Sequence, residues 1–228
     1  MKQFTFTERK TYDLLPDGRA LVYFNEVQAT EIDTHDDGSE ETRTVWRYSR
    51  TTAENASRDA IISALIRVRY STDDELALSR QKDAKIGEYN TYNAYAEWCK
   101  AYAKRLLEGD TLASAKALKI AGLLAYDAST EVNSFLINGQ SLWLSPERRA
   151  NYLLTIEAAQ EAGVETVPFE GINLPVATAL AALKAINIYA MQCVAVTNAH
   201  EAAINALETI EAVDAYDYTI GYPKKLSF

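Results

Sequence analysis

Hydrophobic and polar positions alternate along the first fifty residues, and a period of two predicts β-strands. Two alternating segments, RALVYFNEVQATEID and EETRTVWRYSR, flank the polar run THDDGS, in which Asp37-Gly38 is a typical hairpin-turn dipeptide. A short strand at residues 4–7 and a turn at residues 16–18 precede them. The N-terminal part is therefore predicted to contain a long β-hairpin.

The spacing of apolar residues becomes helical after residue 52. Ile61, Leu65 and Val68 recur at steps of four and three, and Ser71 marks the start of a further helix. A longer helix is predicted in KIGEYNTYNAYAEWCKAYAKRLLEG, where an apolar stripe runs at alternating steps of three and four and Gly109 ends the pattern.

The longer helix carries a second, aromatic stripe formed by Tyr95, Trp98 and Tyr102. A helix that is apolar on two sides packs on two sides, so we interpret the stripe as burial within the fold. The alternative is an oligomer or partner surface, because Tyr and Trp are common anchors at protein interfaces.

A second hairpin is predicted in EVNSFLINGQSLWLSPERR. Residues 132–137 and 140–144 have strand character, and Asn138-Gly139 between them supplies the positive φ angles of a two-residue turn. Ser145 then caps a helix that has Pro146 at its first position and ends at Gly163. A further extended segment is expected at ETVPFEGINLP.

From residue 176 to residue 217 the chain has no Gly or Pro and keeps a helical spacing. This predicts one very long helix, or two helices with a break near residues 197–198. We therefore expect an α+β protein that is mainly helical, with a long N-terminal β-hairpin and a small second hairpin packed on long C-terminal helices. Residues 109–111 are the best boundary between two domains, residues 1–109 and 110–228.

Composition and charge disfavour several classes of partner. A chain of 228 residues with 48% hydrophobic content can bury a core of its own. Its net charge of −9 disfavours nucleic acid, because that affinity depends on clustered Lys and Arg. The sequence has no signal-peptide core at its start and no uninterrupted apolar run of ~18 residues. We expect a soluble protein made in the cytoplasm, with no membrane partner.

The motifs of common enzyme chemistry are missing from the sequence. It contains no glycine-rich phosphate loop, no HExxH, no CxxC and no GxSxG. The acidic run around Asp33, Asp37 and Gly38 partly fits a calcium loop, but Thr44 occupies the position of the last carboxylate ligand. We expect no catalytic residue, no cofactor and no metal ion.

The two cysteines, Cys99 and Cys193, fall in predicted helices and are expected to be buried free thiols. Cys193 lies seven residues before His200, which corresponds to ~10 Å along a helix. That distance is too long for a hydrogen bond between thiol and imidazole, so the pair is not expected to act as nucleophile and base.

The segment from residue 201 to residue 217 contains acidic residues and no Lys or Arg. Glu208, Glu211 and Asp214 follow each other at steps of three on the predicted final helix. We interpret them as a solvated acidic face. The alternative is a docking surface for a basic partner.

The C-terminal half contains, in order, VNSF, ING followed by LW, PERR, YA followed by C, and AYDYTIGYP. In this order the segments resemble a domain of unknown function from tail-fibre and tail-assembly proteins of tailed phages and prophages, with Bacteroides-type examples most similar. The N-terminal segments YSTDDELALSRQ and EYNTYNAYAEWCKAYAK look like the part that accompanies this domain.

The resemblance implies a non-enzymatic protein of a phage or prophage tail module. Such a protein is either a structural component of the tail or tail fibre, or an assembly factor such as a chaperone. Its partners would be phage tail or fibre proteins, and the long helices permit a homo-oligomer. It would be cytoplasmic when synthesised and part of the virion if structural. The alternatives are a generic bacterial protein-interaction module and an enzyme with an unrecognised site.

The resemblance also implies that the second hairpin and its following helix form a packing centre. Phe135, Trp143 and Leu144 would be its structural core, and a core position for the tryptophan predicts that Trp143→Ala costs ~3–5 kcal/mol. The alternative makes the Asn138-Gly139 turn an exposed docking loop.

Overall fold

The structure of this chain, a computed structural model, describes residues 2–35, 37 and 39–228. Helices and small antiparallel sheets make up the described part of the chain, so the predicted α+β class is confirmed. The predicted turn at Asp37-Gly38 includes Gly38, which lies outside the described residues.

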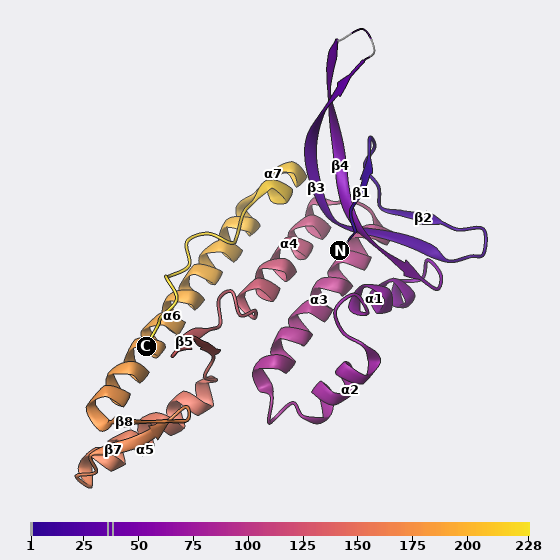
Figure 1. Cartoon of the computed structure of the whole chain (residues 1–228). Helices are drawn as coiled ribbons and strands as arrows, with labels where there is room; N and C mark the ends of the chain where they lie inside the picture. The colour runs from indigo at the N-terminus through magenta and orange to yellow at the C-terminus, as the bar shows by residue number, and fades with distance from the viewer. Residues whose placement is uncertain (1, 36, 38) are drawn as a thin grey trace.

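An antiparallel sheet in the order β1-β4-β3-β2 forms the N-terminal end of the molecule. Its strands are β1 (Phe4–Phe6), β2 (Tyr12–Leu14), β3 (Ala20–Thr34) and β4 (Glu40–Ala53). β1 pairs with residues 46–48 and β2 with residues 20–22. β3 and β4 pair with each other along their length, and beyond the short strands they project from the body as a two-stranded ribbon (Figure 1). We call residues 27–34 and 40–45 the arm.

One face of the sheet packs against the first helices, α1 (Arg58–Ile66) and α3 (Ile86–Glu108), which are separated by α2 (Thr72–Arg80). The core between them is apolar because β3 alternates inward and outward positions and each helix turns one stripe towards the sheet. Val22 of β3, Leu65 of α1 and Cys99 of α3 are all fully buried there.

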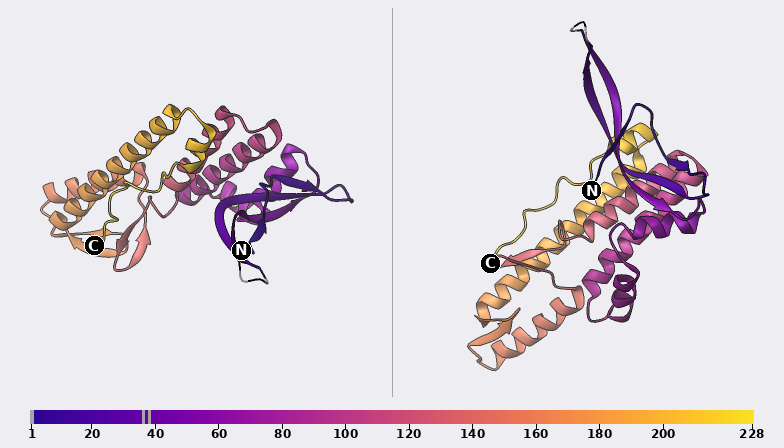
Figure 2. Two further views of the ribbon diagram at one scale, coloured as in Figure 1. Left: turned by 90° about the horizontal axis from the view of Figure 1, so that it is seen from above. Right: turned by 45° about the vertical axis from the view of Figure 1, so that its right-hand side comes forward.

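The helices of the molecule are packed in a row that also includes α4 (Leu112–Asp127), α5 (Pro146–Glu161), α6 (Val176–Ala206) and α7 (Ile210–Ala215). α3 contacts α4, α4 contacts α6 and α7, and α6 contacts α5 (Figure 2). The predicted domain boundary at residues 109–111 forms the turn between α3 and α4. The two predicted domains therefore contact each other through neighbouring helices.

The predicted second hairpin is confirmed as β5 (Phe135–Ile137) and β6 (Gln140–Leu142). Asn138 and Gly139 have φ angles of 49° and 80°, as a two-residue turn requires. The Ser145 side chain accepts a hydrogen bond from the Arg148 backbone N–H at 3.2 Å, and this caps α5 as expected.

The extended segment predicted at residues 165–175 folds as a separate hairpin, β7 (Thr166–Phe169) and β8 (Ile172–Pro175). The expected extended conformation is confirmed, and the two strands form a sheet of their own apart from the β5–β6 pair. Val167 and Phe169 point into a shared core with α5 and α6. The hairpin therefore closes the end of the helix row.

The three expected core residues differ in burial. Phe135 and Leu144 are both 0% exposed and belong to the C-terminal core. Trp143 is only partly buried, and its ring lies 6.4 Å from the rings of both Phe135 and Tyr189. The tryptophan therefore bridges two clusters at their edge, and its placement at the packing centre is wrong.

The long helical pattern forms α6 and α7 as two helices, but the predicted break near residues 197–198 is wrong. α6 continues through this point because Thr197 is buried and its hydroxyl donates to Asp127 Oδ1 of α4 at 2.7 Å. The helix ends at Ala206, and the next residue, Leu207, has an extended backbone. Thr209 then caps α7 by accepting from the Ala212 N–H at 3.2 Å.

Candidate functional site

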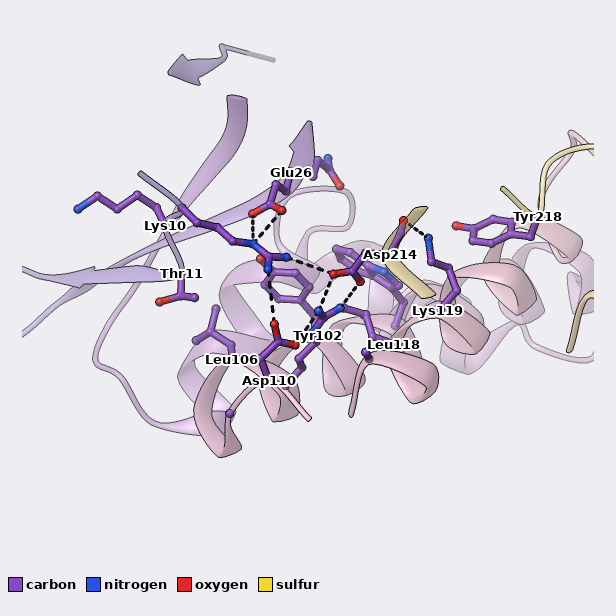
Figure 3. A pocket seen from close by; sticks show the side chains of 17 residues that line it. Lys10, Thr11, Glu26, Tyr102, Leu106, Asp110, Leu118, Lys119, Asp214 and Tyr218 are labelled. Atoms are coloured by element: carbon purple, nitrogen blue, oxygen red, sulfur yellow. Dashed lines mark hydrogen bonds and ion pairs between the residues drawn. The ribbon is translucent and has the colours of Figure 1, made fainter. Parts of the chain in front are cut away.

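A cleft of about 440 Å³ lies where the sheet meets the helix row (Figure 3). Charged side chains line it, and five of them, each from a different segment, form one network of contacts. Arg9 comes from the β1–β2 connection, Glu26 from β3, Arg105 from the end of α3, Asp110 from the α3–α4 turn and Asp214 from α7. We call these five residues the latch.

A local irregularity in β3 turns Glu26 towards the cleft. The register between β3 and β4 shifts between Phe24 and Val27, and Asn25 adopts a φ of 54°. Asparagine tolerates this left-handed conformation better than most residues, and bulges of this kind redirect side chains. The Tyr48 hydroxyl donates to Glu26 Oε2 at 2.7 Å, which fixes the carboxylate at the base of the arm.

The latch is a continuous ion network. Arg9 Nε donates to both carboxylate oxygens of Glu26 at 2.9 Å, and its Nη2 lies 3.3 Å from Asp214 Oδ2. Arg105 donates to both oxygens of Asp214, at 2.7 and 2.8 Å, and its Nε donates to Asp110 Oδ1 at 2.7 Å. The network therefore joins the N-terminal turn, the base of the arm, α3 and α7.

The charges of the latch stabilise each other. Burial opposes the charge of Asp214, but the hydrogen bonds and charges of Arg105 and Arg9 outweigh this effect and lower its pKa. Burial likewise opposes the charge of Arg105, and its carboxylate partners still raise its pKa. Burial lowers the pKa of Lys119, whose Nζ donates to the backbone carbonyls of Asp214 and Tyr216 at 2.8 and 3.0 Å.

This arrangement holds together elements that are far apart in the sequence. The residues that line the cleft include no His or Cys, and Asp214 is a weak base because its pKa is low. Within residues 2–35, 37 and 39–228, no group of three His, Cys, Asp or Glu residues is placed to hold a metal ion. Comparison with protein-family models, curated proteins and solved structures gives no match.

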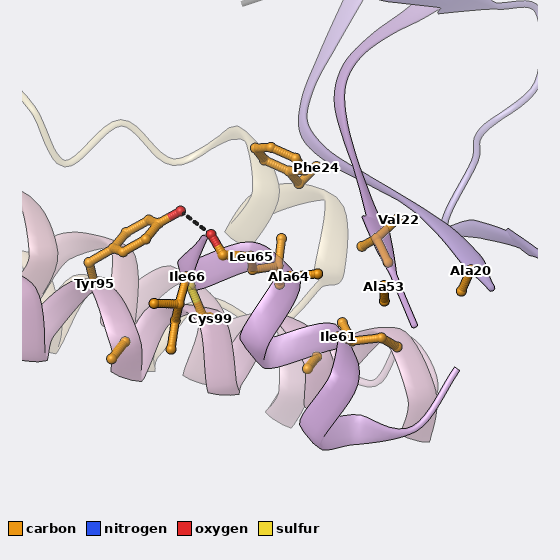
Figure 4. Packing of buried hydrophobic residues seen from close by; sticks show 12 residues of the cluster. Ala20, Val22, Phe24, Ala53, Ile61, Ala64, Leu65, Ile66, Tyr95 and Cys99 are labelled. Carbon is orange, nitrogen blue, oxygen red and sulfur yellow. Dashed lines mark hydrogen bonds between the residues drawn. The ribbon is translucent and has the colours of Figure 1, made fainter. Parts of the chain in front are cut away.

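The aromatic stripe of α3 packs inside the molecule. Tyr95 is 4% exposed, and its hydroxyl donates to the Leu65 carbonyl of α1 at 2.8 Å (Figure 4). The Tyr102 hydroxyl donates to the Tyr23 carbonyl of β3. The Trp98 ring lies between them, 5.7 and 5.3 Å from their centroids, and lines the cleft. Burial is confirmed, and a free partner surface at Tyr95 and Tyr102 is wrong.

The predicted acidic face does not exist as one helix face. Glu208 precedes α7, Glu211 is exposed on α7, and Asp214 turns inward to the latch. The chain changes direction between α6 and α7, so the spacing of three along the sequence no longer places these residues in line. A continuous acidic docking surface at the three positions is therefore wrong.

The segment AYDYTIGYP, which carried part of the sequence resemblance, fastens the C-terminal residues to α4 and α6. The Tyr216 hydroxyl bonds to His200 Nδ1 at 2.7 Å, and His200 Nε2 donates to the Ile220 carbonyl at 2.9 Å. The Tyr218 hydroxyl would lie 2.8 Å from a Cβ at position 122, which explains Gly122 in the middle of α4. These tyrosines therefore serve internal packing.

The arm has two chemically different faces because side chains alternate across a strand. On one face Arg43 lies between Glu31 and Asp33, at 3.7 and 2.7 Å from their carboxylates. The residues of the other face, up to the Ile32–Thr42 pair, are uncharged: Gln28, Thr30 and Ile32 on β3, and Thr42 and Thr44 on β4. Ile32 is 62% exposed, so this uncharged face is open.

Proposed function

We propose that this chain is a non-enzymatic protein of a phage or prophage tail module, as a component of the tail or tail fibre or as a factor that assembles it. We further propose that the arm is its partner-binding element. The projecting arm is the observation that supports the proposal most strongly. The sequence resemblance to tail-associated proteins supports the phage context.

The physical state of the arm favours a partner. A two-stranded ribbon is only marginally stable alone in water, and its outer strand edges keep backbone N–H and C=O groups available. Ile32 on the uncharged face is 62% exposed, and Val27 on the opposite face is 53% exposed. A partner strand could pair with an edge of the arm, as in binding by strand addition, and would then cover Ile32 on the uncharged face.

The base of the arm is held firmly, as a binding element requires. Glu26, one residue before the arm, accepts hydrogen bonds from Arg9 and from Tyr48. Arg9 in turn contacts Asp214 of α7. Because a fixed base limits the directions that the arm can take, less conformational entropy is lost on binding.

The arm can be tested by shortening it. Thr30 and Thr44 are cross-strand partners, so an Asn-Gly turn can replace residues 31–43 and keep the rest of the sheet. A finer test is Ile32→Glu. Its matched control is Leu154→Glu on α5, since Leu154 is also a large apolar residue and is 67% exposed.

The measurement is mass spectrometry of particles purified after induction of the source strain, with copy number normalised to the major tail protein. Binding to identified particle proteins in the lysate is measured in parallel. We expect the wild-type chain and Leu154→Glu to associate, and the shortened arm and Ile32→Glu to lose association while circular dichroism shows a folded body. A wild-type chain absent from particles and bound to no particle protein would contradict the phage function. Full association of the shortened form would contradict the role of the arm.

A further inference from the structure

The outer face of α6 is exposed, and its middle part carries apolar side chains. Exposed positions recur along it from Ala177 to Asn205 at alternating steps of four and three. In the middle of this row Ile188 and Met191 are 54% and 69% exposed, and Val194 beside the row is 56% exposed. α6 lies along one long edge of the molecule, and its opposite face packs on α4 and α5 (Figure 1). We call the exposed row from residue 177 to residue 205 the α6 stripe.

The spacing of the stripe points to another helix. Alternating steps of three and four give an average of 3.5 residues, the repeat of a helix that pairs with a second helix along a seam. Ala195 lies in the stripe one helical turn from Met191, whereas Ala181 lies seven residues before Ile188 and Ala202 eleven residues after Met191. Small residues at such positions allow two helix backbones to approach closely, so Ile188 and Met191 could pack between them.

An uncharged span in the middle of α6 is bordered by one residue of each charge. From residue 185 to residue 200 there is no Asp, Glu, Lys or Arg. Lys184 precedes this span and Glu201 follows it. Within the described part of the chain, neither side chain forms an ion pair. Both are therefore free to pair with a charge outside this chain.

We propose that the α6 stripe binds the α6 stripe of a second copy of this chain, antiparallel and about a two-fold axis at Met191. Lys184 lies seven residues before this point and Glu201 ten residues after it. Antiparallel pairing brings Lys184 of each copy within one helical turn of Glu201 of the other, at both ends of the seam. Parallel pairing would instead place Lys184 against Lys184, so complementary charge selects the antiparallel dimer.

A lipid bilayer fits this face less well, although α6 is long and apolar enough to cross a membrane by length and composition alone. The uncharged span of residues 185–200 has a length of ~24 Å at 1.5 Å per residue, which is shorter than the ~30 Å of a hydrocarbon core. The inner face of α6 is occupied by buried contacts such as the hydrogen bond from Tyr189 to the Val132 carbonyl, 2.7 Å long. Binding to a lipid surface also does not require exposed side chains at an average spacing of 3.5 residues.

Sedimentation velocity of the full chain over a range of concentrations tests the dimer. We expect a concentration-dependent dimer in the wild type and a rise of more than about tenfold in its dissociation constant for Met191→Glu, because two carboxylates would meet at the two-fold axis. Leu154→Glu on α5 is the matched control, with comparable exposure at a site outside the seam, and should leave the dimer unchanged.

Charge exchange tests the direction of pairing. Lys184→Glu and Glu201→Lys should each weaken the dimer, and the double variant should restore it, since antiparallel pairs would again be of opposite sign. Circular dichroism confirms folding of each variant. A chain that stays monomeric at every concentration overturns the proposal, as does a monomer that binds phosphatidylcholine vesicles through α6. A double variant as weak as the single ones overturns the antiparallel arrangement. None of these results affects the arm proposal, whose test uses different residues.

Discussion

Replacing Asp214 by asparagine is expected to lower the free energy of unfolding by about 2 kcal/mol. The carboxylate accepts two hydrogen bonds from Arg105, at 2.7 and 2.8 Å, and one from Arg9 at 3.3 Å. The Arg105 side chain is 13% exposed, so losing its partner costs more than the ~0–1 kcal/mol of a surface ion pair. Asp110 still pairs with Arg105 at 2.7 Å, so the cost stays below the ~3–5 kcal/mol of a fully buried broken pair.

The pH dependence of this loss has a defined sign. Because the latch lowers the pKa of Asp214 in the folded chain, its contribution is complete above the unfolded pKa of ~3.9 and disappears as pH falls through the lower folded pKa. The difference between wild type and Asp214→Asn should therefore stay constant between about pH 8 and pH 5 and shrink below about pH 4. At neutral pH, the loss should lower the melting temperature by ~4–8 °C for a chain of this length.

Urea unfolding followed by circular dichroism at several pH values measures both effects. Glu211→Gln is the matched control, since it removes one carboxylate from the same helix at an exposed position, and it should change stability by less than about 0.5 kcal/mol. A double-mutant cycle with Arg105→Gln should give a coupling of ~1 kcal/mol or more. The reasoning is refuted if Asp214→Asn behaves like Glu211→Gln, or if its effect is the same at pH 3 as at pH 7.

Two further predictions concern the C-terminal half. Phe135→Ala should lower the free energy of unfolding by ~3–5 kcal/mol because the ring is fully buried. Trp143→Ala should lower it clearly less, since Trp143 lies at the edge of two clusters. Urea melts that show the reverse order would contradict this argument from burial. Burial raises the pKa of Asp127, so Asp127→Asn, which keeps an acceptor for the Thr197 hydroxyl, should stabilise the chain at pH 7. This gain should disappear as pH falls towards ~4, and a loss of stability at pH 7 would show that the charge is needed.

The local signals that predicted the fold correctly are those that depend on few residues. Asn138-Gly139 specifies a two-residue turn by itself, and the hairpin forms there. The next hairpin was missed because its turn is Glu170-Gly171, and Glu170 has a φ of 47° that glutamate rarely adopts. Its carboxylate is held by Arg148 at 2.9 Å and by the Tyr152 hydroxyl at 3.0 Å. Tertiary contacts therefore stabilise a turn that local preference does not indicate.

The candidate site could not be predicted from local patterns for a related reason. Arg9 and Asp214 are 205 residues apart in sequence and meet only because α7 packs on α4 beside the base of the arm. The helical spacing of Glu208, Glu211 and Asp214 suggested one acidic face, but it assumed an uninterrupted helix. Thr209 is a typical N-cap residue, so the start of a new helix could have been predicted from the sequence. The position of the Asp214 side chain depends on the whole fold.

The arm and the α6 stripe have different consequences if both proposals hold. Both surfaces expose apolar side chains that a folded chain usually covers. The arm belongs to β3 and β4, and the stripe belongs to α6. A two-fold dimer through α6 would display two arms, so a partner with repeated sites would be bound twice and the second contact would be intramolecular. Loss of the dimer through Met191→Glu would then weaken partner association although the arm is intact. Shortening the arm would leave the dimer unchanged, and this asymmetry separates the roles of the two surfaces.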